Sequence, residues 1–222
     1  MLIINYLKRI SEELNISIGI QSIDEINNIS INSLAEERLT EKELMIFKTF
    51  KFEKRKSEWL AGRIAAKKAF QDYSNISGNT NIKNISILND GNRAPFILEL
   101  PNLELSISHS SQYAIAVVSN SKIGIDLERI TEHNPSIIKY YFSDDESLKI
   151  NDKSNKDNEF NEVITKYWTR KEAVAKYLKL GMKINFKLLD TTTEYLSVVN
   201  NSYGKIRLLS QKIDDYYFSI AI

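Results

Sequence analysis

The segment Ile123–Arg129, which reads IGIDLER, constrains the fold of this chain more than any other segment. Apolar residues alternate in it with Gly124, Asp126 and Glu128, and this period of two is typical of a strand with one buried face. Successive side chains of a strand point to opposite faces, so Asp126 and Glu128 project from the same face. A hard divalent cation such as magnesium prefers oxygen ligands and would relieve the repulsion between these carboxylates. The alternative interpretation is a solvated acidic face on an edge strand.

Composition excludes several classes of protein. The 222 residues are 42% hydrophobic, which is enough for one sizeable core or two small ones. The 30 basic and 29 acidic residues leave a net charge of +1, so we expect neither a nucleic-acid nor a membrane partner. Without cysteine, the chain has no disulfide, thiolate metal site or cysteine nucleophile. The first apolar run is too short for a signal peptide, and we expect a cytoplasmic protein.

A basic helix is predicted in the first half of the chain. Residues 58–70 have a helical pattern that places Arg63 and Lys67 one turn apart on the same face. A run of lysines with one arginine, within residues 48–56, precedes this helix. A solvated basic face is the alternative to a role in binding an anion.

Local signals mark other elements less completely. Capping boxes at Thr40–Glu43 and Ser143–Glu146 predict the starts of two helices. Residues 1–33 are poorly patterned, apart from a strand predicted over residues 17–23.

A β-meander is predicted in the middle of the chain. Residues 103–108 alternate in polarity, and the apolar segment 113–118 returns alongside them before the acidic strand. His109 lies at the end of the first of these strands, at a turn. It is a candidate ligand-binding residue, and the alternative is a turn residue bonded to nearby backbone.

The strongest helical pattern covers residues 159–180, with Gly181 as its predicted stop. Trp168, Glu172 and Lys176 recur at every fourth position and form one stripe. We interpret Trp168 as a core residue. A salt bridge on the helix surface, worth only about 0.2–0.5 kcal/mol, is the alternative role for Glu172 and Lys176.

Three further strands, predicted over residues 194–199, 205–209 and 216–222, form a second antiparallel meander. The chain is therefore predicted to be an α+β protein with two α/β segments of comparable size. No sequence repeat at a fixed spacing is visible.

Two of these motifs together resemble the paired signature of 4′-phosphopantetheinyl transferases. The GIDLE of Gly124–Glu128 is followed some forty residues later by WTRKEA and then Lys176. Three further segments resemble the family in the same order, and they are Glu58–Arg63, Ser106–Ser110 and Phe142–Glu146. The matches run from about residue 48 to residue 182.

The resemblance implies a fold and an activity. The length is similar to that of the Sfp-type branch, in which one chain holds two similar, pseudo-twofold related α/β halves, here 1–118 and 119–222. The second half would carry the metal carboxylates. Such enzymes transfer the 4′-phosphopantetheine group from coenzyme A to a serine of an apo carrier protein and release 3′,5′-ADP. The expected cofactor is Mg²⁺, with Mn²⁺ as a substitute, and the expected assembly is a monomer.

The resemblance also implies roles for individual residues. Asp126, Glu128 and Glu172 would hold the metal, and Glu172 would be the general base that activates the serine. Lys176 would neutralise the pyrophosphate or the leaving phosphate, and His109 would bind the 3′-phosphate. The full set expected to bind the cofactor is Arg63, Arg93, Ser108, His109, Asp126, Lys171 and Lys176. Within it, Lys171 would reach a phosphate oxygen, and Arg93 would replace the basic residue of the family's shorter turn.

Two other functions remain open at the level of sequence. One is a coenzyme A-binding or carrier-binding protein without catalysis, although the carboxylates and Lys176 are all present. The other is a different magnesium-dependent phosphotransferase, which lacks support because the sequence contains no phosphate-binding glycine loop.

Overall fold

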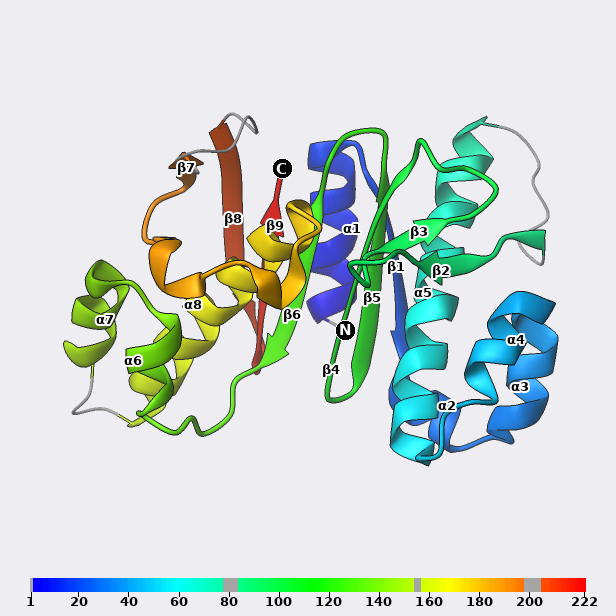
Figure 1. The fold of residues 1–222 in the computed structure, drawn as a ribbon, viewed down its shortest axis with the longest axis horizontal. Coiled ribbons are helices and arrows are strands. Elements are labelled where there is room, and N and C mark those ends of the chain that lie inside the picture. Colours follow the sequence, from blue (N-terminus) through cyan, green and yellow to red (C-terminus); the bar gives the residue numbers. More distant parts are fainter. Residues whose placement is uncertain (1, 78–83, 154–156, 198–204) are drawn as a thin grey trace. The chain divides into compact units, whose positions relative to one another are not determined.

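Two antiparallel sheets, of three and four strands, each packed against one long helix, form the framework of this computed structural model (Figure 1). The structure describes residues 2–77, 84–153, 157–197 and 205–222. Packing divides the chain into two units, Met1–Ile123 and Gly124–Ile222. The predicted α+β class, with antiparallel strands packed against helices, is confirmed. The domain assignment 1–118 and 119–222 stays a prediction, because close packing alone does not show that either half folds by itself.

The first unit contains a three-stranded antiparallel sheet in the order β1-β5-β4 and a separate two-stranded ribbon, β2-β3. The elements are α1 (Leu2–Leu14), β1 (Ser17–Ser22), α2 (Ile23–Asn27), α3 (Ile31–Arg38), α4 (Glu41–Phe47), α5 (Glu53–Ser77), β2 (Ile87–Asn89), β3 (Pro95–Ile97), β4 (Glu104–Ser110) and β5 (Tyr113–Ser119). The predicted basic helix is α5, and the predicted meander is β4 with β5.

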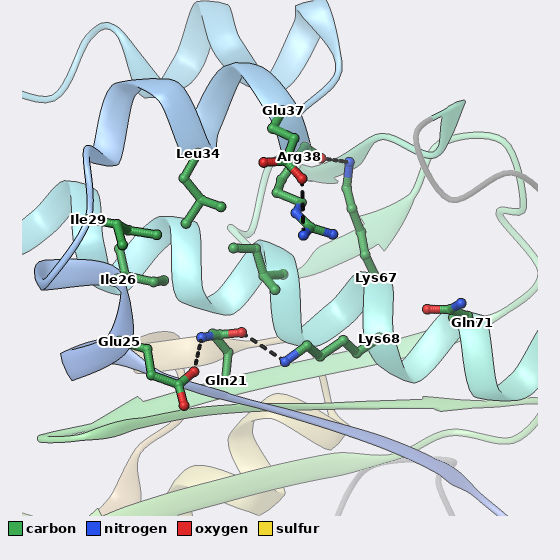
Figure 2. Close-up of a pocket in the computed structure, with 11 residues that line it drawn as sticks. Gln21, Glu25, Ile26, Ile29, Leu34, Glu37, Arg38, Lys67, Lys68 and Gln71 are labelled. Carbon is green, nitrogen blue, oxygen red and sulfur yellow. Dashed lines mark hydrogen bonds and ion pairs between the residues drawn. The ribbon is translucent and has the colours of Figure 1, made fainter.

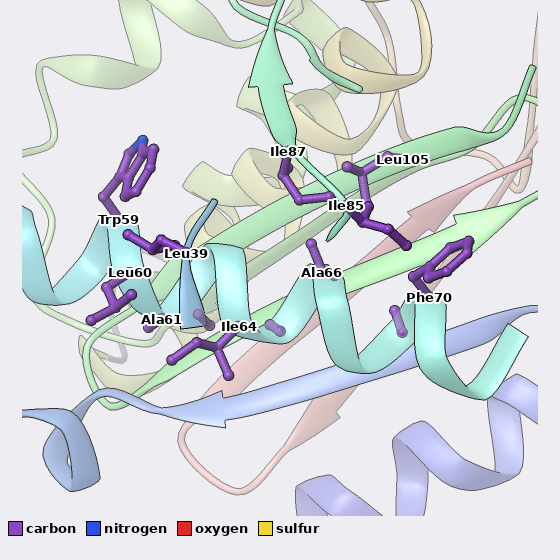
Figure 3. Packing of buried hydrophobic residues seen from close by; sticks show 14 of the residues in the cluster. Leu39, Trp59, Leu60, Ala61, Ile64, Ala66, Phe70, Ile85, Ile87 and Leu105 are labelled. Atoms are coloured by element: carbon purple, nitrogen blue, oxygen red, sulfur yellow. The ribbon is translucent and has the colours of Figure 1, made fainter. Parts of the chain in front are cut away.

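The core of the first unit forms around α5 (Figure 3). Leu60, Ala61 and Ala65 on this helix are completely buried, and Ile87 and Leu105 belong to the same hydrophobic cluster. Burial of this apolar surface stabilises the unit by about 25 cal/mol per Å² removed from water. The small alanines let the helix backbone approach the sheet closely.

The second unit contains a four-stranded antiparallel sheet in the order β6-β9-β8-β7. Its elements are β6 (Gly124–Arg129), α6 (Ile137–Tyr141), α7 (Asp144–Asn151), α8 (Asp157–Tyr177), the 3₁₀ turns η2 (Gly181–Lys183) and η3 (Phe186–Leu188), β7 (Tyr195–Ser197), β8 (Lys205–Ile213) and β9 (Tyr216–Ala221). The register pairs Asp126 with Ser219 and Glu128 with Tyr217. The acidic strand therefore lies at one edge of this sheet and pairs with the last strand of the chain.

Helix ends follow local chemistry, but two helices differ in extent from prediction, and α5 spans Glu53–Ser77 rather than residues 58–70. Both predicted capping boxes are present, at the starts of α4 and α7. Helix α8 ends at Tyr177 rather than Leu180. Lys179 adopts a left-handed φ of 55°, and the Leu180 N–H donates to the Ala175 carbonyl at 3.1 Å. This backbone closure ends the helix before the predicted glycine.

The poorly patterned N-terminal region is mostly helical in the structure. It holds α1, α2 and part of α3 beside the predicted strand. Ile3, Leu7 and Ile10 form the buried face of α1. Their spacing is that of one helical stripe, so the signal was present in the sequence and was missed. Within the described ranges, no helix combines the length and the apolar character needed to cross a bilayer.

A short shared segment becomes visible when the two glycine contacts are compared. A Cβ on Gly19 of β1 would lie 2.0 Å from the Ala65 carbonyl oxygen of α5, and one on Gly124 of β6 would lie 2.0 Å from the Ala173 carbonyl oxygen of α8. The flanking sequences are IGIQ from Ile18 and IGID from Ile123. The two units therefore share a short glycine-containing strand segment, and two such segments do not make a sequence repeat at a fixed spacing.

The Gly124 contact predicts a large stability difference between two glycine substitutions. Gly124→Ala should lower the free energy of unfolding by about 3 kcal/mol, because the new methyl group overlaps backbone atoms of α8. Gly91→Ala is the matched control, since a Cβ there meets nothing within 4 Å. Urea denaturation of both variants measures the difference, and equal midpoints would contradict the close approach of helix and strand.

Candidate functional site

A cavity of about 460 Å³ in the first unit brings together three of the predicted cofactor residues, Arg63, Arg93 and His109. We call it the arginine pocket, because Arg55 also lines it. Its walls come from α4, α5, β2, β3, β4 and the turn between β2 and β3. The complete lining is Ile46, Arg55, Glu58, Trp59, Gly62, Arg63, Leu88, Asn89, Arg93, Pro95, Ile107 and His109.

Arg63 is held rigidly at this pocket. Its guanidinium packs over the Trp59 ring at 4.3 Å from the ring centroid. Its Nε donates to the Ile87 carbonyl at 3.1 Å, and its Nη2 donates to Asn89 Oδ1. Burial lowers the pKa of Arg63 to about 10, so the group remains charged at neutral pH. Both hydrogen-bond acceptors are neutral, so neither cancels the charge, and the arrangement suits an anionic ligand.

The turn between β2 and β3 carries Arg93 to the pocket. Asp90 organises this turn by accepting from the N–H groups of Asn92 and Ala94 at 2.8 and 2.9 Å. Arg93 itself has a left-handed φ of 66°, and its carbonyl accepts from the Asn89 side chain at 2.7 Å. The location of Arg93 at the pocket agrees with its predicted use as the basic turn residue, which stays a prediction.

His109 and Ser108 are separated by the alternation of β4. We predicted that His109 lies at the turn after this strand. In the structure it lies within β4, where it pairs with Ala114 of β5. Its ring lines the arginine pocket, as does Ile107, two positions earlier. Ser108 is buried and points to the opposite face of the strand, so the structure does not bring it to this pocket.

A second group, the carboxylate site, lies in the second unit and consists of Asp126, Glu172 and Lys176. Gly124 allows α8 to pack directly on β6, and Asp126 follows on the same face of the strand. The Lys176 Nζ and the Asp126 Oδ1 are 2.7 Å apart, although the residues are 50 positions apart in the chain. Asp126 is 3% exposed, whereas the Lys176 side chain is partly exposed, so the lysine side of this ion pair remains open to water.

The electrostatics of this site centre on Glu172. Burial raises the pKa of its carboxyl above the ordinary value of 4.5, and the nearby Asp126 charge raises it further, while Lys176 opposes the change. A carboxyl with a raised pKa is a stronger base when ionised, which suits proton abstraction near neutral pH.

The carboxylate oxygens of this site are suitable ligands for a divalent cation. Asp126 and Glu172 are close enough to repel each other, and oxygen ligands are those that magnesium prefers. Glu128 lies on the same face of β6 and is partly exposed. Across the part of the chain that the structure describes, no three His, Cys, Asp or Glu side chains form a ready-made metal cluster. Lys176 bonds to Asp126 here, so the ion pair would have to rearrange for a metal to be bound through that oxygen.

The structure does not support the phosphate contact predicted for Lys171. This side chain has no exposed surface, and its Nζ lies 2.7 Å from Glu146 Oε2. The Nζ also donates to the carbonyl groups of Phe186 and Leu189. The helical stripe of Glu172 and Lys176 therefore faces the site, whereas Lys171 points into the interior.

Sequence reasoning missed several residues that shape these sites. Asn89 is not singled out from the sequence, and Glu146 is interpreted there only as part of a helix cap. The interpretation of Trp168 as a core residue agrees with its edge-to-face contacts with Tyr141 and Phe186. The lysines and arginine of residues 48–56 lie mostly on exposed surface. A polar residue just after a strand was the available signal for Asn89.

A further cavity, of about 410 Å³, lies on another side of α5 (Figure 2). Ile26, Ile29, Leu34 and Ile64 form its apolar part. Gln21 bridges Glu25 and Lys68 at its polar edge, with distances of 3.1 and 2.8 Å (Figure 2). None of the predicted site residues lines this cavity.

Two protein-family models match the chain. Residues 122–221 match the model of the 4′-phosphopantetheinyl transferase superfamily, and residues 43–119 match that of the 4′-phosphopantetheinyl transferase N-terminal domain. A holo-[acyl-carrier-protein] synthase of Streptococcus agalactiae is 42% identical over 88 residues, which cover 38% of this chain and 74% of that protein. A 4′-phosphopantetheinyl transferase of Aneurinibacillus migulanus is 31% identical over 83 residues, which cover 37% of this chain and 34% of that protein.

Among solved structures, the chain is similar to a holo-(acyl-carrier-protein) synthase from Bacillus anthracis in complex with CoA (3′,5′-ADP). The identity is 33%, the match covers 46% of this chain and 91% of that chain, and the TM-score is 0.40.

The raised pKa of Glu172 predicts a pH-dependent stability difference for Glu172→Gln in metal-free buffer. Because the folded chain holds this proton more tightly than the unfolded chain, stability falls as the pH rises from the unfolded pKa through the folded pKa. The variant lacks this loss. At pH 7 it should be more stable than the wild type by about 1.4 kcal/mol for each unit of the rise in pKa.

Urea denaturation between pH 3.5 and 8 provides the measurement, and the advantage of the variant should disappear at the acidic end. The exposed Glu132→Gln is the control and should show no such trend. A Glu172→Gln variant less stable than the wild type at pH 7 would contradict a carboxyl destabilised by burial.

Proposed function

The chain belongs to the 4′-phosphopantetheinyl transferase superfamily, and we propose that it transfers 4′-phosphopantetheine from coenzyme A to a serine of an apo carrier protein. It is then an enzyme with holo-[acyl-carrier-protein] synthase activity, of the branch that holds both regions in one chain. The observation that carries this proposal is the carboxylate site. There the carboxyl groups of Glu172 and Asp126 and the ammonium group of Lys176 lie together on α8 and β6.

The reaction requires a base and positive charge at defined places. The serine oxygen forms a bond to the β-phosphorus of the coenzyme A pyrophosphate, the bond from that phosphorus to the bridging oxygen breaks, and 3′,5′-ADP leaves. Glu172 accepts the proton of the serine hydroxyl, for which its raised pKa is suited. Lys176, one helical turn away, neutralises negative charge on the leaving phosphate. Such phosphoryl transfers depend on positioning and electrostatic stabilisation rather than on covalent help from the protein.

Asp126, Glu128 and Glu172 would hold the divalent metal. Bound there, Mg²⁺, or Mn²⁺ in its place, would supply neutralisation of the pyrophosphate charge. In the absence of metal, Lys176 supplies the positive charge next to Asp126.

The arginine pocket suits the nucleotide end of coenzyme A. Arg63 offers a buried, fixed positive charge, and Arg93 and His109 add donors at the rim. We assign the 3′-phosphate to His109, with Arg63 and Arg93 binding other anionic oxygens. Ser108 and Lys171 have no role in this proposal, because both side chains are buried away from the proposed ligands. Action as a cytoplasmic monomer stays a prediction from the sequence.

The direct test is mass spectrometry of purified apo carrier proteins after incubation with the chain, coenzyme A and magnesium. The expected result is a mass gain on the carrier equal to one phosphopantetheine arm, and no gain in a control with EDTA. Coenzyme A binding without transfer to any carrier of a broad panel would favour the alternative, a binding protein without catalysis.

Glu172→Gln should lower kcat by about 10³-fold, because the amide cannot accept the serine proton. Glu162→Gln is the matched control, since Glu162 lies on the same helix but bonds to Lys212 and Tyr217. Steady-state transfer assays measure both variants. Turnover of Glu172→Gln within about twofold of the wild type would remove Glu172 from the mechanism.

His109→Ala should weaken binding of coenzyme A more than binding of dephospho-coenzyme A, because only coenzyme A carries the 3′-phosphate. Titration calorimetry with both nucleotides gives the comparison, and we expect about a tenfold larger loss for coenzyme A. The other histidine, His133, bonds to Thr165 and serves as the control. An equal loss for both ligands would contradict the assignment.

A further inference from the structure

Each unit contains a buried glutamate–lysine pair with the same set of partners. In the first unit, Glu43 caps α4 by accepting from the Thr40 N–H at 2.9 Å. The same carboxylate accepts from Lys67 Nζ at 2.8 Å and from the Ile87 N–H at 3.1 Å. Glu43 is 0% exposed and Lys67 is 4% exposed.

The second unit repeats this arrangement. Glu146 caps α7 by accepting from the Ser143 N–H at 2.9 Å. It also accepts from the Thr191 N–H at 2.8 Å and from Lys171 Nζ at 2.7 Å. The spacing is preserved, since the glutamate and its backbone donor are 44 positions apart in the first unit and 45 in the second. The two lysines lie on different helical turns, because the Ala65 and Ala173 contacts align Lys171 with Arg63. Both ammonium groups are nevertheless buried against a capping glutamate, so Lys171 belongs to the framework, as Lys67 does.

Each pair connects to a proposed functional residue through a short path. In the first unit, the Ile87 N–H bonds to Glu43 and the Ile87 carbonyl accepts from Arg63 Nε. The orientation of this peptide segment therefore couples Lys67 and Glu43 to the guanidinium in the arginine pocket.

In the second unit the path is shorter. The Lys171 ammonium joins α8 to Glu146 and to the carbonyl groups of Phe186 and Leu189. Glu172 is the next residue on α8, so the rotation of the helix about its own axis sets the direction of the Glu172 side chain. The anchor at Lys171 opposes this rotation.

We propose that the two buried pairs are positioning residues, with Glu43–Lys67 orienting Arg63 for coenzyme A binding and Glu146–Lys171 orienting Glu172 for proton transfer. The roles of Arg63 and Glu172 rest on the proposed function. Loss of the first pair should therefore act on affinity and loss of the second on turnover. A phosphate contact by Lys171 would give the opposite result for the second pair.

The test uses double-mutant cycles, because removing one partner leaves a buried charge unpaired and strongly destabilises the folded chain. Lys171→Met, Glu146→Gln and the double variant form one cycle, and Lys67→Met, Glu43→Gln and their double variant form the other. Each double variant removes both charges and keeps the side-chain volumes similar. The partly exposed ion pair Lys212–Glu162, which joins β8 to α8, is the control through Lys212→Met/Glu162→Gln.

The readouts are kcat in the transfer assay and the dissociation constant of coenzyme A by calorimetry, both corrected for the folded fraction. We expect the Glu146–Lys171 double variant to lose about 10²-fold in kcat, with a dissociation constant within about twofold of the wild type. The Glu43–Lys67 double variant should bind coenzyme A about tenfold more weakly, with little change in kcat. Within each cycle the single changes should be strongly non-additive, because both partners act through one contact.

Two results would overturn the proposal. Weaker coenzyme A binding by Lys171→Met but not by Glu146→Gln would make Lys171 a phosphate ligand. Wild-type kinetic constants in both double variants would reduce the pairs to a purely structural role.

Transfer and coenzyme A binding by the wild-type chain test the proposed function independently of the variants. A wild type that binds coenzyme A without transfer contradicts the proposed turnover and, with it, the role of the Glu146–Lys171 pair. The dissociation constant of the Glu43–Lys67 double variant then decides the role of that pair. A wild type that neither transfers nor binds contradicts the proposed function and the inference together.

Discussion

The close approach of one helix to one strand is the constraint on which each unit depends. At Gly19 and Gly124 the helix backbone occupies the space that a side chain would fill, so α5 and α8 lie directly against β1 and β6. This contact sets the depth at which the helix lies and therefore which of its residues face the sheet. In the second unit it brings Lys176 within 2.7 Å of Asp126. The site follows from a backbone contact that only glycine permits.

The polar side chains beside the two glycine contacts differ between the units, although the strand and helix pack in the same way. Gln21 follows Gly19 at the position where Asp126 follows Gly124. Lys68 follows the Ala65 contact at the position where Lys176 follows the Ala173 contact, and Ile64 stands where the second unit has Glu172. In the first unit the ammonium donates to an amide oxygen at 2.8 Å, whereas in the second it donates to a carboxylate at 2.7 Å, with the carboxylate of Glu172 nearby. Because repulsion between carboxylates creates the demand for a cation, only the second framework is suited to a divalent metal.

The interior pairs explain why neighbouring residues on one helix have different tasks. Lys171 and Glu172 are adjacent, yet one is completely buried and the other is partly exposed beside Asp126. A rotation of about 100° per residue separates them around the helix axis. The short motif that contains both residues therefore combines an anchor and a reactive group.

Much of the fold and part of the site could be predicted from the sequence. Alternation identified the acidic strand, four-residue spacing joined Glu172 to Lys176, and capping boxes located the starts of α4 and α7. These are local properties, decided within a few residues. The N-terminal helix α1 was equally local, and its buried stripe was simply missed.

Long-range packing decided the rest. The sequence by itself determined which side chains share a face of a strand or helix, since backbone geometry repeats with a fixed period. Only the tertiary structure decided what each face meets. It brought Arg63, Arg93 and His109 to one cavity, turned Ser108 away from it, and directed Lys171 toward Glu146. The physical reason is that such contacts depend on how helices pack on sheets across many intervening residues, and no local period contains that information.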